Sequence, residues 1–292
     1  MHDYLRSVGF ANIKTKKEED DLIKEVLKHP TERYLTETDG ITFAEFRREY
    51  GAFTGVAVRG EFDSDNKFHV HYYYPYFQGS GMTSREKIEF EKHSDKMAYA
   101  GIIDDIRVGS SLIFYLQNLI PYLRMKKMGK KVEGVREIKL SGLSTKGTVL
   151  LPVYKRLQME DNNPSGPSNR TRLIAAAREG DEEAIESLTL EDIDLYSMIS
   201  KRVMTEDILS IVESTFMPSG IESDEYYLIG EIIDLEEETN PDTDEKIYQL
   251  TLNCNDIFFD ICINEEDLMG EPKIGRRFRG GVWLQGEVDF EE

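Results

Sequence analysis

The stretch FTGVAVRGEFDSDNKFHVHYYYPYF, residues 53–77, decides the fold class of this chain. Two runs rich in valine, tyrosine and phenylalanine flank DSDN, a tetrapeptide of turn-forming residues at 63–66. Aromatic and β-branched residues favour strands, and a polar turn between two such runs predicts a β-hairpin. We therefore expect an antiparallel sheet in the N-terminal half of the chain.

The sequence before and after this hairpin predicts helices and further strands. Residues 18–30, EEDDLIKEVLKHP, carry apolar residues at helical spacing and end at Pro30, which predicts a helix. Residues 83–100 open with Thr-Ser before Glu, a capping pattern that predicts a second helix. The apolar run over 106–127 fits either a strand followed by a helix or a single helix. We favour the strand followed by a helix, because Gly109 and two serines interrupt only its first half.

Residues 136–156, REIKLSGLSTKGTVLLPVYKR, predict two more strands around the turn STKG. The lysine and glycine of this turn superficially resemble a phosphate-binding loop, but that loop requires GxxxxGK[ST] between a strand and a helix. A strand follows here, so we expect a hairpin turn. Together these elements predict an α+β fold, with an N-terminal antiparallel sheet and helices forming one domain over residues 1–157.

A polar stretch divides the chain, whose 292 residues are enough for two domains. Residues 158–170, QMEDNNPSGPSNR, carry no apolar periodicity, which predicts a linker. Residues 171–221 then predict a short helical segment. Residues 222–292 hold four runs of strand-forming residues between polar turns, which predicts a small closed β-barrel or a strongly twisted sheet. We favour the barrel, whose layout is similar to the oligonucleotide/oligosaccharide-binding (OB) fold.

Charge is the clearest compositional signal, with 36 basic and 56 acidic residues and a formal net charge of −20. Residues 222–292 carry 21 acidic and 5 basic side chains, a net charge of −16, which repels nucleic-acid phosphates. No apolar run approaches the roughly 18 residues of a membrane helix, and the N-terminus lacks a signal-peptide pattern. Cys254 and Cys262 are the only cysteines, too few for a disulfide framework. We expect a cytoplasmic protein without membrane contact.

Five stretches carry a resemblance that covers nearly the whole chain: MHDYLRSVGF, YAGIIDDIRVGSSLIFYLQN, LSTKGTVLLPV, LTLEDIDLYSMISKR and RRFRGGVWLQGEV. In these stretches the sequence resembles a clostridial (Firmicutes) protein family of about this length, described as a domain of unknown function. The resemblance is whole-chain similarity without a catalytic motif. It therefore supports the compartment and the domain division, and implies no activity.

The strand over residues 68–77 supplies the first candidate site. Alternation along a strand would place His69, His71 and Tyr73 on one face, and two such histidines can share a metal ion. A third ligand would have to come from His93, Asp104 or Asp105. A strand with solvent-facing histidines explains the same pattern, because aromatic residues favour strands. We therefore expect no metal and no cofactor, and treat His69, His71 and Tyr73 as ligand-contact candidates.

The stretch YAGIIDDIRVGSS, residues 99–111, supplies the second candidate site. Asp104 and Asp105 could form an acid–base or metal-binding pair, but adjacent residues of a strand face opposite sides. A turn in which one aspartate pairs with Arg107 is the interpretation that we favour. Asp105 and Arg107 are therefore further candidates for ligand binding.

The stretch RRFRGGVWLQG, residues 276–286, supplies the third candidate site. Arginine beside aromatic residues on a barrel strand is typical of single-stranded nucleic-acid binding. The acidic surroundings indicate instead that these arginines pair with carboxylates of their own domain. We expect a surface for protein contact, with these candidates: Arg276, Arg277, Arg279 and Trp283.

The sequence contains no HExxH, CxxC, EF-hand, P-loop or GxSxG motif. It therefore favours a cytoplasmic protein–protein interaction or scaffolding module over an enzyme. Two alternatives stay open. One is an enzyme or small-ligand sensor with a pocket in the N-terminal domain, near His69, His71 and Asp105. The other is single-stranded nucleic-acid binding by the C-terminal barrel, which the acidic charge disfavours.

Overall fold

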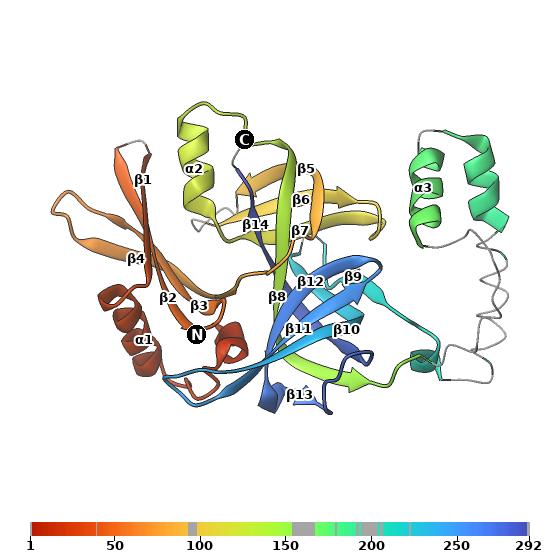
Figure 1. Cartoon of the computed structure of the whole chain (residues 1–292). Helices are drawn as coiled ribbons and strands as arrows, with labels where there is room; N and C mark the ends of the chain where they lie inside the picture. The colour runs from red at the N-terminus through yellow and green to blue at the C-terminus, as the bar shows by residue number, and fades with distance from the viewer. Residues whose placement is uncertain are drawn as a thin grey trace.

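The computed structural model describes residues 2–38, 40–92, 98–153, 167–178, 180–190, 193, 204, 207–221 and 223–290. Strands dominate these residues and form a 4-stranded antiparallel sheet, called sheet A, and a 10-stranded mixed sheet, called sheet B (Figure 1). Several helices accompany the strands, which confirms the α+β class. Within the described ranges, no helix is long and apolar enough to cross a membrane.

Sheet A contains the hairpin that the sequence predicts. Its strands lie side by side in chain order: β1 (Glu32–Thr38), β2 (Ile41–Gly51), β3 (Thr54–Phe62) and β4 (Phe68–Phe77). Strands β3 and β4 pair antiparallel with Phe62 opposite Phe68, so the turn DSDN connects them as expected. The sheet order leaves β4 as an edge strand, with β3 as its one neighbour in sheet A.

Helix α1 (Lys16–Lys28) packs against β2 and β3. The Thr15 hydroxyl accepts the backbone N–H of Glu18, and the Glu18 carboxylate accepts the backbone N–H of Thr15, which together form a capping box. Leu22 and Val26 are buried on the face toward the core. The helix predicted from the apolar spacing is therefore confirmed.

Sheet B draws its strands from both halves of the chain. Its strands are β5 (Ser84–Lys92), β6 (Tyr99–Asp105), β7 (Ser110–Leu116), β8 (Gly134–Leu150), β9 (Thr215–Pro218), β10 (Glu225–Thr239), β11 (Lys246–Cys254), β12 (Ile257–Asn264), β13 (Leu268–Met269) and β14 (Arg277–Val288).

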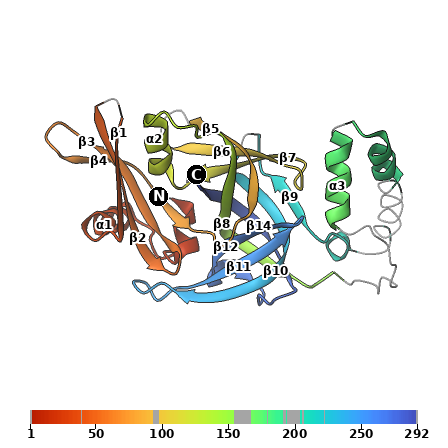
Figure 2. The same ribbon diagram turned by 45° about the horizontal axis from the view of Figure 1, so that its top comes forward.

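The helices and 3-10 turns besides α1 include α2 (Leu119–Lys127), α3 (Pro167–Arg178), η1 (Asp3–Val8), η2 (Ile208–Ser210) and η3 (Glu265–Asp267). Because β7 leads into α2, the predicted strand followed by a helix is confirmed. Sheet A and α1 lie at one end of the molecule and α3 at the other (Figure 2).

The pairings of sheet B close two rings that share β8 and β14. One ring runs through β10, β11, β12, β8 and β14, and the other through β8, β5, β6, β7 and β14. Strands β8 and β14 pair antiparallel from Ile138 opposite Val288 to Leu150 opposite Arg277. The four strands predicted within residues 222–292 are present, but β8 from the N-terminal half completes their ring. The chain on either side of the expected linker therefore contributes to one sheet.

The helix predicted for residues 83–100 is wrong. Residues Ser84–Lys92 form β5, which pairs with β6 on one side and β8 on the other. Ile88 is buried whereas its neighbours Lys87 and Glu89 are exposed, which is the two-residue period of a strand. The alternation of buried and exposed residues, which favours a strand, outweighs the capping pattern, which favours a helix.

The two strands predicted around STKG are also wrong, because β8 continues through this stretch without a turn. Partner strands lie on both sides of it, with β14 on one side and β12 and β13 on the other. The Ser144 hydroxyl donates to the Gly281 carbonyl at 2.8 Å. A Cβ at Gly147 would overlap the Phe278 ring, so this glycine provides packing space rather than a turn.

Candidate functional site

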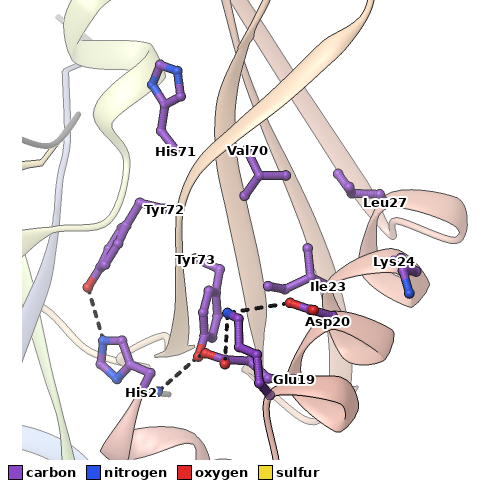
Figure 3. Close-up of a pocket in the computed structure, with 11 residues that line it drawn as sticks. His2, Glu19, Asp20, Ile23, Lys24, Leu27, Val70, His71, Tyr72 and Tyr73 are labelled. Carbon is purple, nitrogen blue, oxygen red and sulfur yellow. Dashed lines mark hydrogen bonds and ion pairs between the residues drawn. The ribbon is translucent and has the colours of Figure 1, made fainter.

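A groove of about 660 Å³ lies between α1 and β4 and is open to solvent (Figure 3). Helix α1 lines one side, and the first half of β4, called its outer half, lines the other. Val70 and Tyr73 point toward α1, whereas His71 and Tyr72 point to the opposite side of the strand. The N-terminal segment closes one end. The lining residues are His2, Lys16, Glu19, Asp20, Ile23, Lys24, Leu27, Val70, His71, Tyr72 and Tyr73.

The wall from α1 follows from helical spacing. Lys16, Glu19, Ile23 and Leu27 recur three or four residues apart, so they lie on one face of the helix. The first turn of this face is charged and the later turns are apolar. The groove therefore has a polar end near the start of α1 and an apolar floor beyond it.

The wall from β4 depends on a β-bulge at His71. Arg59 lies opposite Tyr72, and the next residue of β3, Gly60, lies opposite Val70, which leaves His71 as the extra residue. A Cβ at Gly60 would overlap the His69 carbonyl oxygen, so the close approach of the two strands requires glycine there. The bulge interrupts strict alternation, and four consecutive residues from Val70 onward line the groove.

Hydrogen bonds order the polar end. The Tyr73 hydroxyl donates to Glu19 and accepts the backbone N–H of His2 at 2.9 Å. Lys16 Nζ lies 3.0 Å from Glu19 Oε2 and 3.4 Å from Asp20 Oδ1. Burial raises the pKa of Glu19, but the hydrogen bonds from Tyr73 and Lys16 outweigh it and hold this pKa below its ordinary value. Burial and the bond to Glu19 raise the pKa of Tyr73 well above its ordinary value.

An aromatic cluster adjoins the groove at its N-terminal end. His2 Nε2 is 3.0 Å from the Tyr72 hydroxyl, and the His2 ring centroid is 5.0 Å from that of Trp283 on β14. The Trp283 indole N–H donates to Asp224 at 2.8 Å. Trp283 is buried, so this predicted surface residue supports the groove from within instead of presenting an interaction surface.

The predicted histidine pair does not converge. His69 Nε2 lies 2.6 Å from Asp63, whereas His71 Nε2 lies 3.6 Å from Glu61. His71 and Tyr73 line the groove, and His69 does not. Across the part of the chain that the structure describes, no group of three His, Cys, Asp or Glu side chains is arranged to hold a metal ion. His93, a candidate third ligand, lies outside the described residues.

Asp105 ends β6 and Arg107 lies in the turn between β6 and β7, away from the groove. Arg107 donates to both carboxylate oxygens of Asp105, at 2.9 and 2.5 Å, and the Ser84 hydroxyl donates at 2.9 Å. Burial raises the pKa of Asp105, but these bonds hold it below its ordinary value. Asp104 is exposed and accepts from Ser111 at 2.6 Å. The favoured turn, with one aspartate paired to Arg107, is confirmed.

The three arginines near β14 have different partners. Arg276 lies 3.8 Å from the carboxylate of Glu271, as expected for pairing with local acids. Arg279 lies over the Tyr227 ring at 5.6 Å. Arg277 is buried, and the expectation that it pairs with a carboxylate is wrong, because it donates to three backbone carbonyls. These belong to Leu151, Leu209 and Val212.

Sequence reasoning did not identify Lys16 and Glu19 as groove residues. Their only signal is the capping pattern at Thr15 and the three-residue spacing that follows it. The contact that makes them part of a site joins Glu19 to Tyr73, 54 residues later in the chain.

A comparison with protein families matches residues 5–286 to the family described as "Domain of unknown function, E. rectale Gene description (DUF3881)". Comparisons with curated proteins and with solved structures found no match. The matched range includes α1, β4 and every strand of sheet B up to Gly286. The resemblance to a Firmicutes family is therefore confirmed, and the chain belongs to the DUF3881 domain family.

Proposed function

We propose that this chain is a protein-interaction module whose groove between α1 and β4 receives an extended segment of a partner protein. One observation carries the proposal: the outer half of an edge strand forms a wall of an open groove. Edge strands present backbone N–H and C=O groups that can pair with an added strand.

The second half of β4, called its inner half, supports this proposal because its outward-facing backbone groups are already bound. Side chains from sheet B bind its outward-facing backbone, with Gln285 Nε2 donating to the Pro75 carbonyl at 2.9 Å and Gln117 Nε2 to the Phe77 carbonyl at 2.8 Å. Outward-facing groups recur at every second residue of an antiparallel strand, so Tyr73 is the next position that faces outward. Tyr73 lies at the groove, where a partner strand would begin to pair.

The side chains of the groove favour an apolar partner residue. Ile23, Leu27 and Val70 form its floor, and Lys16 is already engaged by two carboxylates at the polar end. A partner side chain over this floor would be valine, leucine or isoleucine, flanked by backbone that pairs with β4. Interaction modules commonly combine backbone pairing for affinity with side-chain pockets for specificity.

A small organic ligand is the second candidate, because the volume falls in the range of about 300–1,000 Å³ that is usual for such sites. Acid–base catalysis gains little support from the same residues. The pKa of Glu19 is lowered and that of Tyr73 is raised, so neither group would exchange a proton near neutral pH.

Selection of displayed linear peptides against the full chain tests the proposal. Val70→Glu places a charge on the groove floor, whereas Leu35→Glu is a matched control on β1, at the other edge of sheet A; the two residues are 41% and 45% exposed. Selected peptides should bind the wild type and Leu35→Glu equally, and Val70→Glu about tenfold or more weakly. Equal binding by both variants would contradict a peptide groove at β4.

A further inference from the structure

The connection between α2 and β8 carries an unusual concentration of positive charge for a chain with a net charge of −20. Residues 126–131 read KKMGKK, with four lysines around Met128 and Gly129. All four lysines are exposed, and Met128 is 69% exposed. The segment, called the KKMGKK turn, lies at the top of the molecule in Figure 1, where α2 ends.

The turn has a defined conformation. Gly129 has a φ of +69°, in the left-handed region that favours glycine. Its N–H donates to the Lys126 carbonyl at 3.0 Å, and the Lys130 N–H donates to the Met125 carbonyl at 3.1 Å. These two bonds form a Schellman motif, which ends α2 and holds Met128 at an exposed position between two pairs of lysines.

Within the described part of the chain, one of the four lysines of this turn has a carboxylate within 4.0 Å. Lys127 lies 3.5 Å from Glu37, an exposed pair, and Lys126 lies over the Tyr122 ring at 5.8 Å. Among the described residues, Lys130 and Lys131 have no carboxylate within 4.0 Å. The acidic strand β10 lies toward the bottom of Figures 1 and 2, away from the turn. Because charges are screened over about 8 Å at physiological salt, its carboxylates oppose an anion at the turn only weakly.

We propose that the KKMGKK turn attaches the protein to the surface of an anionic lipid bilayer. The lysine ammonium groups would bind headgroup phosphates, and the Met128 side chain would enter the boundary between headgroups and acyl chains. Val135 is exposed and follows Gly134, the first residue of β8. Because the Lys131 side chain lies close to Gly134, Val135 adds apolar surface next to the turn. The sequence predicts a protein without membrane contact. This proposal departs from that expectation at one surface of the protein.

The composition of the turn favours a bilayer over a nucleic acid. Its cations are lysines, which act as point charges, and the turn holds no aromatic side chain on which a base could stack. An exposed methionine at its centre contributes nothing to phosphate-backbone binding, but it gains free energy when it enters a lipid interface.

Co-sedimentation of the full chain with vesicles tests this proposal. Vesicles of phosphatidylcholine alone are compared with vesicles of phosphatidylcholine and phosphatidylserine in equal parts. The wild type should sediment only with the anionic vesicles. Each lysine near such a surface contributes about fivefold in affinity, so the double variant K130E/K131E should lose binding by at least about twentyfold.

The matched control is K14E/K17E, which changes the net charge equally at exposed lysines near the start of α1. The K14E/K17E variant should retain most of the vesicle binding. M128D keeps every lysine of the turn and should still bind the vesicles more weakly than the wild type. Thermal unfolding checks that each variant is folded. Equal loss in both double variants, wild-type binding by M128D, or binding of single-stranded RNA by these lysines without vesicle binding would overturn the proposal.

Discussion

Glu45 and Arg47 form an ion pair of 2.6 Å, although each side chain is only 2% exposed. Arg59 binds the second carboxylate oxygen of Glu45. Both arginines also donate to the backbone carbonyl of Gln117, at 2.8 and 2.7 Å, directly after β7. One buried carboxylate therefore holds two guanidinium groups of sheet A against sheet B.

Glu45→Gln should destabilise the protein strongly. The substitution removes the carboxylate charge that Arg47 and Arg59 share, and breaking a buried pair typically costs about 3–5 kcal/mol. Urea unfolding measures the loss. Glu49→Gln makes the same change at an exposed position of β2 and should alter the free energy of unfolding by less than about 0.5 kcal/mol. Equal effects of the two substitutions would show that the network contributes little.

The contribution of Glu45 should depend on pH. Burial raises the pKa of Glu45, but Arg59 and Arg47 outweigh it and hold the pKa below its ordinary value of 4.5. A carboxyl group with a lowered folded-state pKa stabilises the protein above its unfolded pKa and loses this effect as pH falls through the folded value. The difference in unfolding free energy between the wild type and Glu45→Gln should therefore be constant near neutral pH and shrink below about pH 4.5. A difference that stays constant into acid would contradict the assignment.

Arg277→Ala should cost more stability than Arg279→Ala. Arg277 is buried and donates to three backbone carbonyls, and a hydrogen bond from a charged donor typically contributes about 1.5–3 kcal/mol. Arg279 lies over the Tyr227 ring at a partly exposed site, where such contacts contribute about 0.5–1 kcal/mol. Urea unfolding of the two variants compares them, and a larger loss for Arg279→Ala would refute this order.

Much of the fold could be predicted because short windows of sequence encode it. The β3–β4 hairpin, α1 and the four C-terminal strands each show their period and turn residues within about a dozen positions. Strands β5 and β8 could not be predicted in the same way. Thr-Ser-x-Glu and STKG have the local signature of a cap and a turn, and only the neighbouring strands of sheet B hold these residues extended.

The site was predicted less well than the fold. His71 and Tyr73 could be identified because they lie in a conspicuously aromatic strand. Glu19, which bonds Tyr73, comes from a helix 54 residues earlier in the chain. The buried position of Glu45 could not be predicted either. Charged residues two apart on a strand usually face solvent, and the carbonyl that binds Arg47 lies 70 residues further along the chain.

Replacing His69 and His71 together by Gln should leave stability and metal content nearly unchanged. Each histidine faces a separate carboxylate at an exposed site, where an ion pair contributes roughly 0–1 kcal/mol. Thermal unfolding and elemental analysis of the purified proteins measure the two quantities. Stoichiometric zinc or iron in the wild type that disappears in the double variant would establish a metal site that the histidines share.

Dividing the chain at the expected linker should separate two pieces that need each other. Strand β14 packs the buried residues Phe278, Val282 and Leu284, and it pairs with β8 along most of its length. A chain of residues 171–292 alone would lose β8 from between β12 and β14, and a chain of residues 1–157 would lose β14 from its own ring. Neither piece should therefore unfold cooperatively by itself, whereas the two expressed together should recover the circular dichroism spectrum of the full chain. A cooperative unfolding transition for residues 171–292 alone would establish the C-terminal region as an independent domain, as the sequence pattern predicts.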